Sequence, residues 1–581
     1  MTKYRKIYKG NLMFFIMNYI KKRFAENKLI GIFILIVSLL FLFGAVSNSL
    51  FEIVSTSPDG PPTSGQIGNG INSFGANKVI YLHSCRVLKV PNSVYILKKD
   101  VSSNGNCFII DADNITLNGN GHKISGAGDL ESKGIFSEGY SGLKVKDIKI
   151  ENYGFGIYLI SGSNESKING VEFYDILNMS IFVFDSNNIE IEDSQFNGNL
   201  GSEVVFLVAK NYSINAHIHD NLFKNNMGGA IRGKGITAII ENNKIFDEGI
   251  PTDENNHRGI WIQSIKEGLA PGKVIVPSDT DIRNNLLVRI GGSGITCSAY
   301  DGNYCDIYNN TLKDIYGPSG IRFGPIGAIA RDNFIFNSQN IGIEVLSRNL
   351  TDIYIINNTI VNSNIGISLI PGLFMQPISN VKVEGNLIIN PFYGLFITGK
   401  SASSNTGSIF INNTILNSRG DAIYLDGKKV SNMTFIGNNI SGTNLEYLDL
   451  NVASENVNYL NFLNNLIGGY SFFGFGSSNV VIEDDNFGKI KFLANITGRG
   501  ERFNDEVILG HNLASIDSDE NQGFNIPAEV TLYNMPGDFE NPAIFRNGEV
   551  CYECVALTGL NEETVMFEVP GAGSYKVAED I

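Results

Sequence analysis

The sequence predicts an all-β protein whose body is a right-handed parallel β-helix, a solenoid of coils of roughly twenty-five residues each. Three observations support this prediction. Short apolar strands recur at a fixed period, and no helical stretch separates them. The composition, with 63 Gly against 16 Pro and many Asn, suits a fold with many tight turns, because Gly and Asn tolerate positive φ at little cost.

The N-terminal segment, residues 1–52, is predicted to be a basic cytoplasmic stretch followed by a membrane anchor. Residues 1–28 contain eight Lys or Arg and one acid, and residues 29–51 carry no charge. An apolar run of this length can cross the hydrocarbon core as a helix, and Lys21, Lys22, Arg23 and Lys28 place the N-terminus inside. The alternative is a cleaved signal peptide. Both interpretations export the rest of the chain, and residues 53–78 form a Pro/Gly/Ser-rich linker.

The repeat spans residues 79–498. Half of each unit is an apolar strand that opens with Gly-Ile or a close variant, as at Gly320-Ile321 and Gly342-Ile343. The other half ends in Asn-x-apolar. These asparagines are Asn221, Asn243, Asn285, Asn310, Asn333, Asn358, Asn386, Asn413, Asn438 and Asn465. All but one of their spacings suit a single coil. The exception, between Asn243 and Asn285, indicates an insertion.

Strands at this period build a coil in which each strand stacks on its counterpart in the next turn. Alternating Ile, Leu and Val then fill the interior. The asparagines are predicted to be scaffold, because an amide at a turn can donate to one coil and accept from the next.

The stretch from Cys107 to Gly126, CFIIDADNITLNGNGHKISG, and the repeats that follow to about residue 490 resemble the right-handed parallel β-helix proteins of the pectate-lyase-like superfamily. The nearest resemblance is to archaeal-type surface β-helix proteins and to copper-associated periplasmic ones. It implies the fold rather than one function, because the superfamily holds lyases, hydrolases, epimerases, adhesins and binding proteins. A copper role finds little support in six His without clustered Met or a Cys-His set.

The six cysteines fall into near-neighbour pairs, which in an exported chain are expected to form disulfides. The pairs are Cys85 with Cys107, Cys297 with Cys305, and Cys551 with Cys554. The last could instead be half a zinc site or a redox pair. Residues 499–581 lose the period and predict a small β-sandwich-like domain.

One outward column follows the Gly-Ile strands. It consists of Phe136, Tyr158, Phe182, Phe206, Arg232, Trp261, Thr296, Arg322, Glu344, Ser368, Phe396 and Tyr424, with Lys234, Gln263 and Ser298 two residues further on. Stacked aromatic rings can support sugar rings, and Arg can donate two hydrogen bonds to a carboxylate. The alternative is that surface sheets favour these residue types in any case. The ligand-binding candidates are Lys234, His257, Trp261, Gln263 and Glu344.

A second outward face precedes the asparagines and contains His217, His219, Glu241, Asp281, Arg283, Asp306, Tyr308 and Arg331. Asp281 and Asp306 are predicted to be neighbours on successive coils. Such a pair could bind Ca²⁺, the one candidate cofactor, or could act as acid and base in sugar hydrolysis. The alternative is a surface ion network in which Arg283 and Arg331 neutralise the two carboxylates.

The insertion between Asn243 and Asn285 is expected to wall a groove beside His257, Arg258 and Trp261, with Asp253 and Glu254 nearby. Two functions follow. The first is a membrane-anchored surface protein that binds carbohydrate or serves in adhesion. The second is an enzyme on acidic polysaccharide: a lyase using Arg232 or Arg322, or a hydrolase using Asp281 and Asp306. Outside the basic N-terminus the chain is acidic, which argues against nucleic acid as a partner.

Overall fold

The computed structural model describes residues 78–580, except for residues 211, 250–257, 265–278, 299–304, 325–326, 348–350, 372–376, 401–402 and 455–456. The described residues all belong to one compact unit, Gly75–Ile581. The predicted anchor, nearly all of the predicted linker and His257 therefore lie outside them. No helix among residues 78–580 is long and apolar enough to span a membrane.

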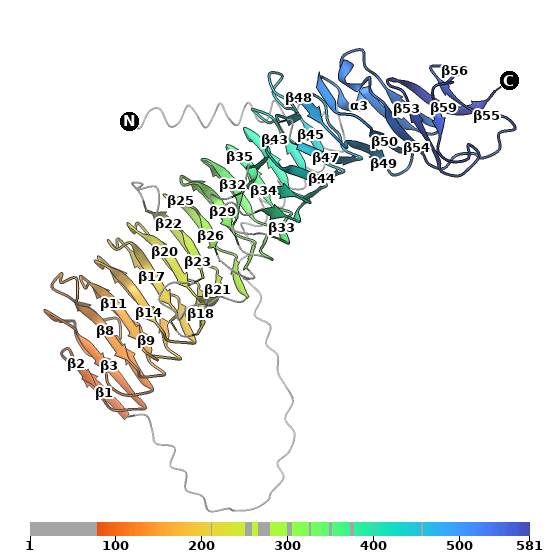
Figure 1. Cartoon of the computed structure of the whole chain (residues 1–581). Helices are drawn as coiled ribbons and strands as arrows, with labels where there is room; N and C mark the ends of the chain where they lie inside the picture. Colours follow the sequence, from red (N-terminus) through yellow and green to blue (C-terminus); the bar gives the residue numbers. More distant parts are fainter. Residues whose placement is uncertain are drawn as a thin grey trace, which may run out of the picture. The chain divides into compact units, whose positions relative to one another are not determined.

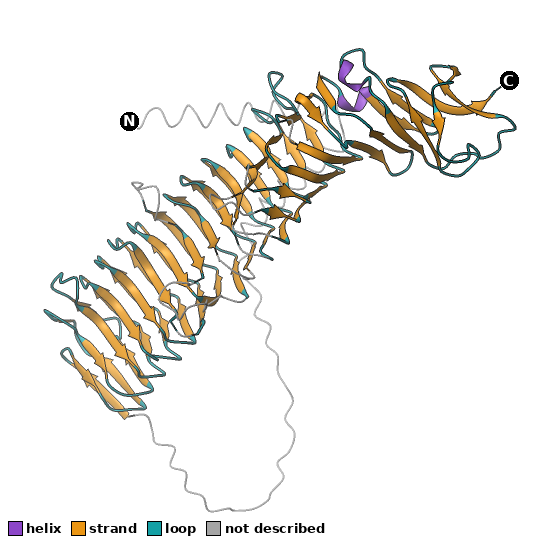
Figure 2. Ribbon diagram, in the orientation of Figure 1, coloured by secondary structure: helices purple, strands orange, loops and turns teal. Residues whose placement is uncertain are grey.

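Most coils of this unit contribute one strand to each of three sheets (Figures 1 and 2). In one coil, β12 (Lys167–Asn169) belongs to sheet 1, β13 (Glu172–Tyr174) to sheet 2 and β14 (Met179–Phe184) to sheet 3, and β15 (Ile189–Glu192) returns to sheet 1. Neighbouring strands pair in parallel, as β12 does with β15 in sheet 1. This arrangement confirms the predicted β-helix.

The alternation of side chains along each strand fills the interior of the coils. Phe173, Phe196 and Phe223 from successive coils of sheet 2 are fully buried, and their rings stack with centroids 4.8 and 4.5 Å apart. The Gly-Ile motif has a steric reason. A Cβ on Gly342 would lie 2.7 Å from the carbonyl oxygen of Gly366 in the next coil and 2.5 Å from Ile360.

The predicted asparagine column forms a continuous ladder. Asn310 shows the repeated pattern: its Nδ2 donates to Asn333 Oδ1 at 3.0 Å and to the carbonyl oxygen of Ile282 at 2.8 Å. Its backbone N–H also donates to Asn333 Oδ1. The residue before it, Asn309, has a φ of 52°, which explains the Asn-Asn pairs, because Asn tolerates the left-handed region. The ladder continues across the insertion, where Asn243 donates to Asn285.

Parallel pairing ends at β49 (Val481–Asp484), which pairs antiparallel with β50 (Gly488–Phe492). Sheet 1 continues from β50 through β54 (Ala528–Leu532) and β58 (Val565–Val569), again antiparallel. After a short helix, α3 (Phe503–Glu506), a separate five-stranded antiparallel sheet forms. Its strands are β52 (Val507–Gly510), β53 (Leu513–Ile516), β59 (Gly573–Glu579), β55 (Pro542–Arg546) and β56 (Glu549–Val550).

All six cysteines are paired as the sequence predicts. The disulfides join Cys85 to Cys107, Cys297 to Cys305, and Cys551 to Cys554. The bond between Cys551 and Cys554 agrees with the disulfide interpretation of that pair.

Candidate functional site

The first predicted column lies on sheet 3 and is in register from Phe136 to Tyr424. Each of its residues pairs with the next one across neighbouring strands. The central strands are β17 (Glu203–Val208), β20 (Gly229–Lys234), β23 (Ile260–Gln263), β26 (Ile295–Ser298) and β29 (Ser319–Phe323). Register is strongly specified here, because a slip of one residue would turn the interior side chains outward.

The N-terminal part of this column is aromatic. Phe136, Tyr158, Phe182 and Phe206 are half-buried, and successive ring centroids are 6.0, 4.9 and 5.9 Å apart. Rings at this spacing pack on one another in tilted and edge-on arrangements. The predicted aromatic ribbon is therefore present.

Trp261 lies two strands beyond Phe206, the last residue of the aromatic ribbon, and two arginines pack against it. The guanidinium of Arg258 lies 3.6 Å from the Trp261 ring centroid, and that of Arg232 lies 4.0 Å from it. Trp261 Nε1 donates to Ser298 Oγ at 3.2 Å. The Trp261 ring is half-buried. It therefore faces outward and also packs against two guanidinium groups.

Among the described residues, not every arginine near Trp261 has a carboxylate partner. Arg232 is ion-paired with Glu203, and Arg322 Nε lies 3.3 Å from Glu344 Oε2. No described carboxylate forms an ion pair with Arg258. Burial, followed by the neighbouring charges of Arg322 and Arg232, lowers the pKa of Arg258 to about 10. A partly buried cation that has no carboxylate partner among the described residues favours an anion beside it.

The other described ligand-binding candidates, Lys234, Gln263 and Glu344, have two different environments. Lys234 and Gln263 pair on neighbouring strands, Gln263 Oε1 accepts from Arg232 at 3.3 Å, and Lys234 Nζ lies 5.5 Å from the Phe206 ring centroid. Glu344 is only 6 % exposed and accepts from Ser319 in the preceding coil. The column is therefore not outward-facing throughout, because Glu344 packs between Ser319 and Arg322 rather than projecting into solvent.

The second predicted face lies on sheet 1. Asp281 of β24 (Thr280–Arg283) pairs directly with Asp306 of β27 (Cys305–Tyr308). Arg331 donates to both carboxylate oxygens of Asp306, at 3.1 and 2.8 Å. Arg283 donates to Glu241 at 2.8 Å and lies 3.8 Å from Asp281. Burial and then the charge of Asp306 raise the pKa of Asp281. This geometry favours the ion-network interpretation.

The predicted catalytic residues do not form one site. Arg232 and Arg322 project from sheet 3, whereas Asp281 and Asp306 belong to sheet 1. A sugar ring held by the two arginines could not contact the two aspartates as well, because the sheets form different faces of the coil.

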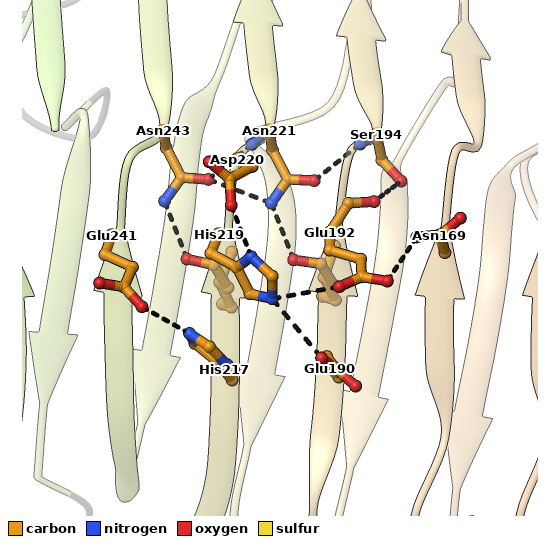
Figure 3. A network of polar contacts seen from close by, with 12 residues as sticks. Asn169, Glu190, Glu192, Ser194, His217, His219, Asp220, Asn221, Glu241 and Asn243 are labelled. Carbon is orange, nitrogen blue, oxygen red and sulfur yellow. Dashed lines mark hydrogen bonds and ion pairs between the residues drawn. The ribbon is translucent and has the colours of Figure 1, made fainter. Parts of the chain in front are cut away.

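Sheet 1 also contains a cluster that the sequence did not mark as a metal site (Figure 3). One donor atom from each of Glu190, His217 and His219 lies within 4.8 Å of the others. Both histidines belong to β18 (Ile214–His219), and Glu190 and Glu192 to β15. The sequence contains a pattern that predicts this cluster, His-x-His in one coil and Glu-x-Glu in the coil before it. Alternate residues of a strand share a face, so these side chains lie on the same side of the sheet.

Hydrogen bonds hold the cluster on both sides. His219 Nδ1 lies 2.8 Å from Asp220 Oδ2, and His217 Nε2 lies 2.9 Å from Glu241 Oε1. Burial acts to lower the pKa of His219, but the hydrogen bond to Asp220 and the nearby Glu190 outweigh it, so the pKa is raised.

Residues 113–317 match a family model described as periplasmic copper-binding protein (NosD). The match includes the histidine cluster and Trp261. No curated protein sequence matches the chain.

Three solved structures illustrate the similarity of fold. An alginate lyase, AlyF-OU02, is 12 % identical over 68 % of this chain and 80 % of its own, with a TM-score of 0.35. The tailspike protein of the E. coli bacteriophage HK620 is 11 % identical over 87 % and 85 %, with a TM-score of 0.38. An exopolygalacturonase from Thermotoga maritima is 11 % identical over 72 % and 87 %, with a TM-score of 0.30. All three likenesses are distant.

Proposed function

We propose that this chain is a membrane-anchored, extracytoplasmic β-helix protein that binds an acidic polysaccharide on sheet 3. The observation that carries the proposal is the pair of guanidinium groups packed against Trp261, those of Arg232 and Arg258, of which Arg258 has no described carboxylate partner. Arg donates paired hydrogen bonds to a carboxylate, and an aromatic ring can support the apolar face of a sugar.

The surroundings support a long ligand rather than a small one. Successive strands present the aromatic residues from Phe136 to Phe206, then Arg232 and then Trp261. A chain of sugar units could therefore contact several coils. Outside its basic N-terminus the chain is acidic. An anionic polymer would therefore be held by local cations and not by the protein's overall charge.

Export and anchoring rest on the sequence of residues 1–52 and on the name of the matched family, which describes periplasmic proteins. Intact cells treated with external protease should lose epitopes located after residue 75 while keeping an N-terminal tag. Protection of the β-helix would contradict this part of the proposal.

Copper, from which the matched family takes its description, has one suitable set of donors among the described residues. Two imidazoles and a carboxylate, from His217, His219 and Glu190, lie close enough to share an ion. Imidazole and carboxylate are ligands that Cu²⁺ accepts. When bound, such an ion would add a positive charge to sheet 1, away from the arginines of sheet 3.

The test compares polyuronates with neutral polysaccharides as ligands of the purified full-length chain. We expect binding of polyuronates only, weakening as salt rises. Arg258→Gln should reduce the affinity by about 10-fold or more, because a hydrogen bond to a charged group contributes about 1.5–3 kcal/mol. Arg331→Gln is the matched control, since Arg331 lies on sheet 1 and is ion-paired with Asp306.

The same mixtures distinguish binding from catalysis. Unsaturated products, detected by ultraviolet absorbance, would indicate a lyase, and new reducing ends without them would indicate a hydrolase. Binding without either product supports the binding function. Equal affinity for neutral and acidic polysaccharides, or no binding at all, would overturn the proposal.

A further inference from the structure

Three neighbouring strands of sheet 1 bring two histidines and three glutamates onto one outward face. In β18, His217 pairs with Glu190 and His219 pairs with Glu192 of β15. On the other side, His219 pairs with Glu241 of β21 (Ile236–Glu241). We propose that His217, His219 and Glu190 bind one divalent transition-metal ion of the Zn²⁺ or Cu²⁺ class. This site is independent of the polysaccharide proposal, because it lies on a different sheet.

The distances suit a shared ion. His219 Nε2 lies 3.5 Å from Glu190 Oε1 and 3.3 Å from Glu192 Oε2. Two donors bound at about 2.1 Å to one tetrahedral ion lie about 3.4 Å apart. The two imidazole centroids are 4.0 Å apart, and one donor atom each of His217, His219 and Glu190 lies within 4.8 Å of the others.

The hydrogen bonds of His219 leave one nitrogen facing the carboxylates. Asp220 accepts from Nδ1, since an ionised carboxylate can only accept. Nε2 is buried and makes no hydrogen bond, although Glu190 and Glu192 lie within ion-pair distance. A neutral imidazole would place a lone pair against two negative oxygens, so either a proton on Nε2 or a bound cation must lie between them. A carboxylate on the second ring nitrogen is also the usual support of a metal-binding histidine.

The charges around the imidazoles agree with a bound cation. Four carboxylates contact the histidine pair: Glu190, Glu192, Asp220 and Glu241. Lys167 pairs with Glu190 and Glu192, and Arg283 pairs with Glu241. With both imidazoles neutral, two negative charges remain, which a divalent ion would balance.

The donor set selects the class of metal. Ca²⁺ and Mg²⁺ take oxygen ligands, whereas paired imidazoles with a carboxylate are typical of Zn²⁺ and also suit Cu²⁺. Described cysteines cannot compete for the ion, because all of them are in disulfides.

The test uses the full-length chain, freed of metal with a chelator and titrated separately with Zn²⁺ and Cu²⁺. We expect saturable binding at a stoichiometry of one by calorimetry. The electron paramagnetic resonance spectrum of the Cu²⁺ form should show coupling to two nitrogens. His217→Ala and His219→Gln should each weaken binding by more than the roughly 10–100-fold cost of losing an outer-shell partner. Each variant should also remove one nitrogen coupling.

Glu190→Gln keeps the size of the side chain and should weaken binding without changing the nitrogen count. His122→Ala is the matched control, because His122 also has a carboxylate partner, Asp100 at 3.2 Å, but lies outside the cluster. No stoichiometric binding of either ion would show that His219 is simply a protonated partner of the acids, and would overturn the proposal. So would unchanged binding in a folded His217→Ala variant, whose half-exposed side chain makes it the safer substitution for folding.

Discussion

The guanidinium of Arg258 lies 3.6 Å from the centroid of the Trp261 ring, and no described carboxylate forms an ion pair with it. The Arg232 guanidinium lies 4.0 Å from the same centroid. Trp261 thus orients two cations beside the aromatic residues of sheet 3, and a bound carboxylate would meet charges already in place. Preorganised donors lose little conformational freedom on binding.

The first prediction concerns this ring. Trp261→Ala should weaken polyuronate binding by about 1–3 kcal/mol, because both guanidinium groups lose the surface that orients them. Titration calorimetry on wild type and variant measures the loss. Tyr424→Ala is the control, since Tyr424 lies in the same column and stacks on Phe396 with centroids 5.2 Å apart. Equal losses in both variants would show that Trp261 has no special role.

The second prediction concerns the asparagine ladder. Asn358 is fully buried and donates to Asn386 at 3.0 Å and to the carbonyl oxygen of Ala330 at 2.8 Å. Asn358→Leu should lower the free energy of unfolding by about 1–3 kcal/mol, because backbone groups of the turns lose a buried partner. Chemical denaturation measures the change. Asn215→Leu, at an exposed position, should cost much less, and equal stability of all three proteins would remove the ladder's role.

The third prediction concerns a buried acid, Glu248, that contacts an asparagine of the preceding coil. Glu248 of β22 (Lys244–Glu248) is fully buried and accepts from Asn226 at 2.8 Å, while its Oε2 has no hydrogen-bond partner. Burial raises the pKa of Glu248 well above its ordinary value. The protonated form is therefore favoured by folding. Its contribution to stability is present below the unfolded pKa of about 4.3 and is lost as pH rises through the folded pKa.

Glu248→Gln should accordingly raise the unfolding midpoint at pH 7 and have no such benefit near pH 4. Each unit by which the pKa is raised corresponds to about 1.4 kcal/mol at neutral pH. Thermal unfolding at several pH values measures the difference, with the exposed Glu446→Gln as control. A variant that is less stable than wild type at every pH would contradict the assignment.

The fourth prediction concerns Ca²⁺ at Asp281 and Asp306. We expect millimolar Ca²⁺ to leave the unfolding midpoint unchanged relative to a chelator, because Arg331 already binds both oxygens of Asp306. Ca²⁺ requires six to eight oxygen ligands, more than two carboxylates supply. A rise in the midpoint that Asp281→Asn abolishes would instead support the calcium site that the sequence suggests.

Much of the fold was predictable because the repeat constrains it locally. The column from Phe136 to Tyr424 and the pairing of Asp281 with Asp306 could both be predicted, since residues at equal positions in successive coils must stack. The burial of Glu344 could not. It depends on which neighbours, Ser319 and Arg322, reach over it, and spacing along the chain does not report those contacts.

The candidate sites show the same division. The sequence identified Arg232, Trp261 and Arg322 as one column and placed Arg258 beside Trp261, but the packing of the Arg258 guanidinium on the ring is seen only in the structure. It placed His217 and His219 on one face, but it did not bring Glu190 to them. That contact depends on the register between β15 and β18 and on where the side chains point, with Glu190 Oε1 3.5 Å from His219 Nε2.

By itself, the sequence determined the repeating architecture, the asparagine ladder and the three disulfides, because each follows from a periodic or local pattern of residue types. The sequence does not show which charged groups form ion pairs and which have no described partner, because that depends on the folded structure. The folded structure assigned Arg331 to Asp306, left Arg258 without a described carboxylate partner, and directed His219 Nε2 at two carboxylates. The physical reason is that an ion pair depends on distances of a few ångströms between side-chain ends, whereas the repeat specifies only where each side chain begins.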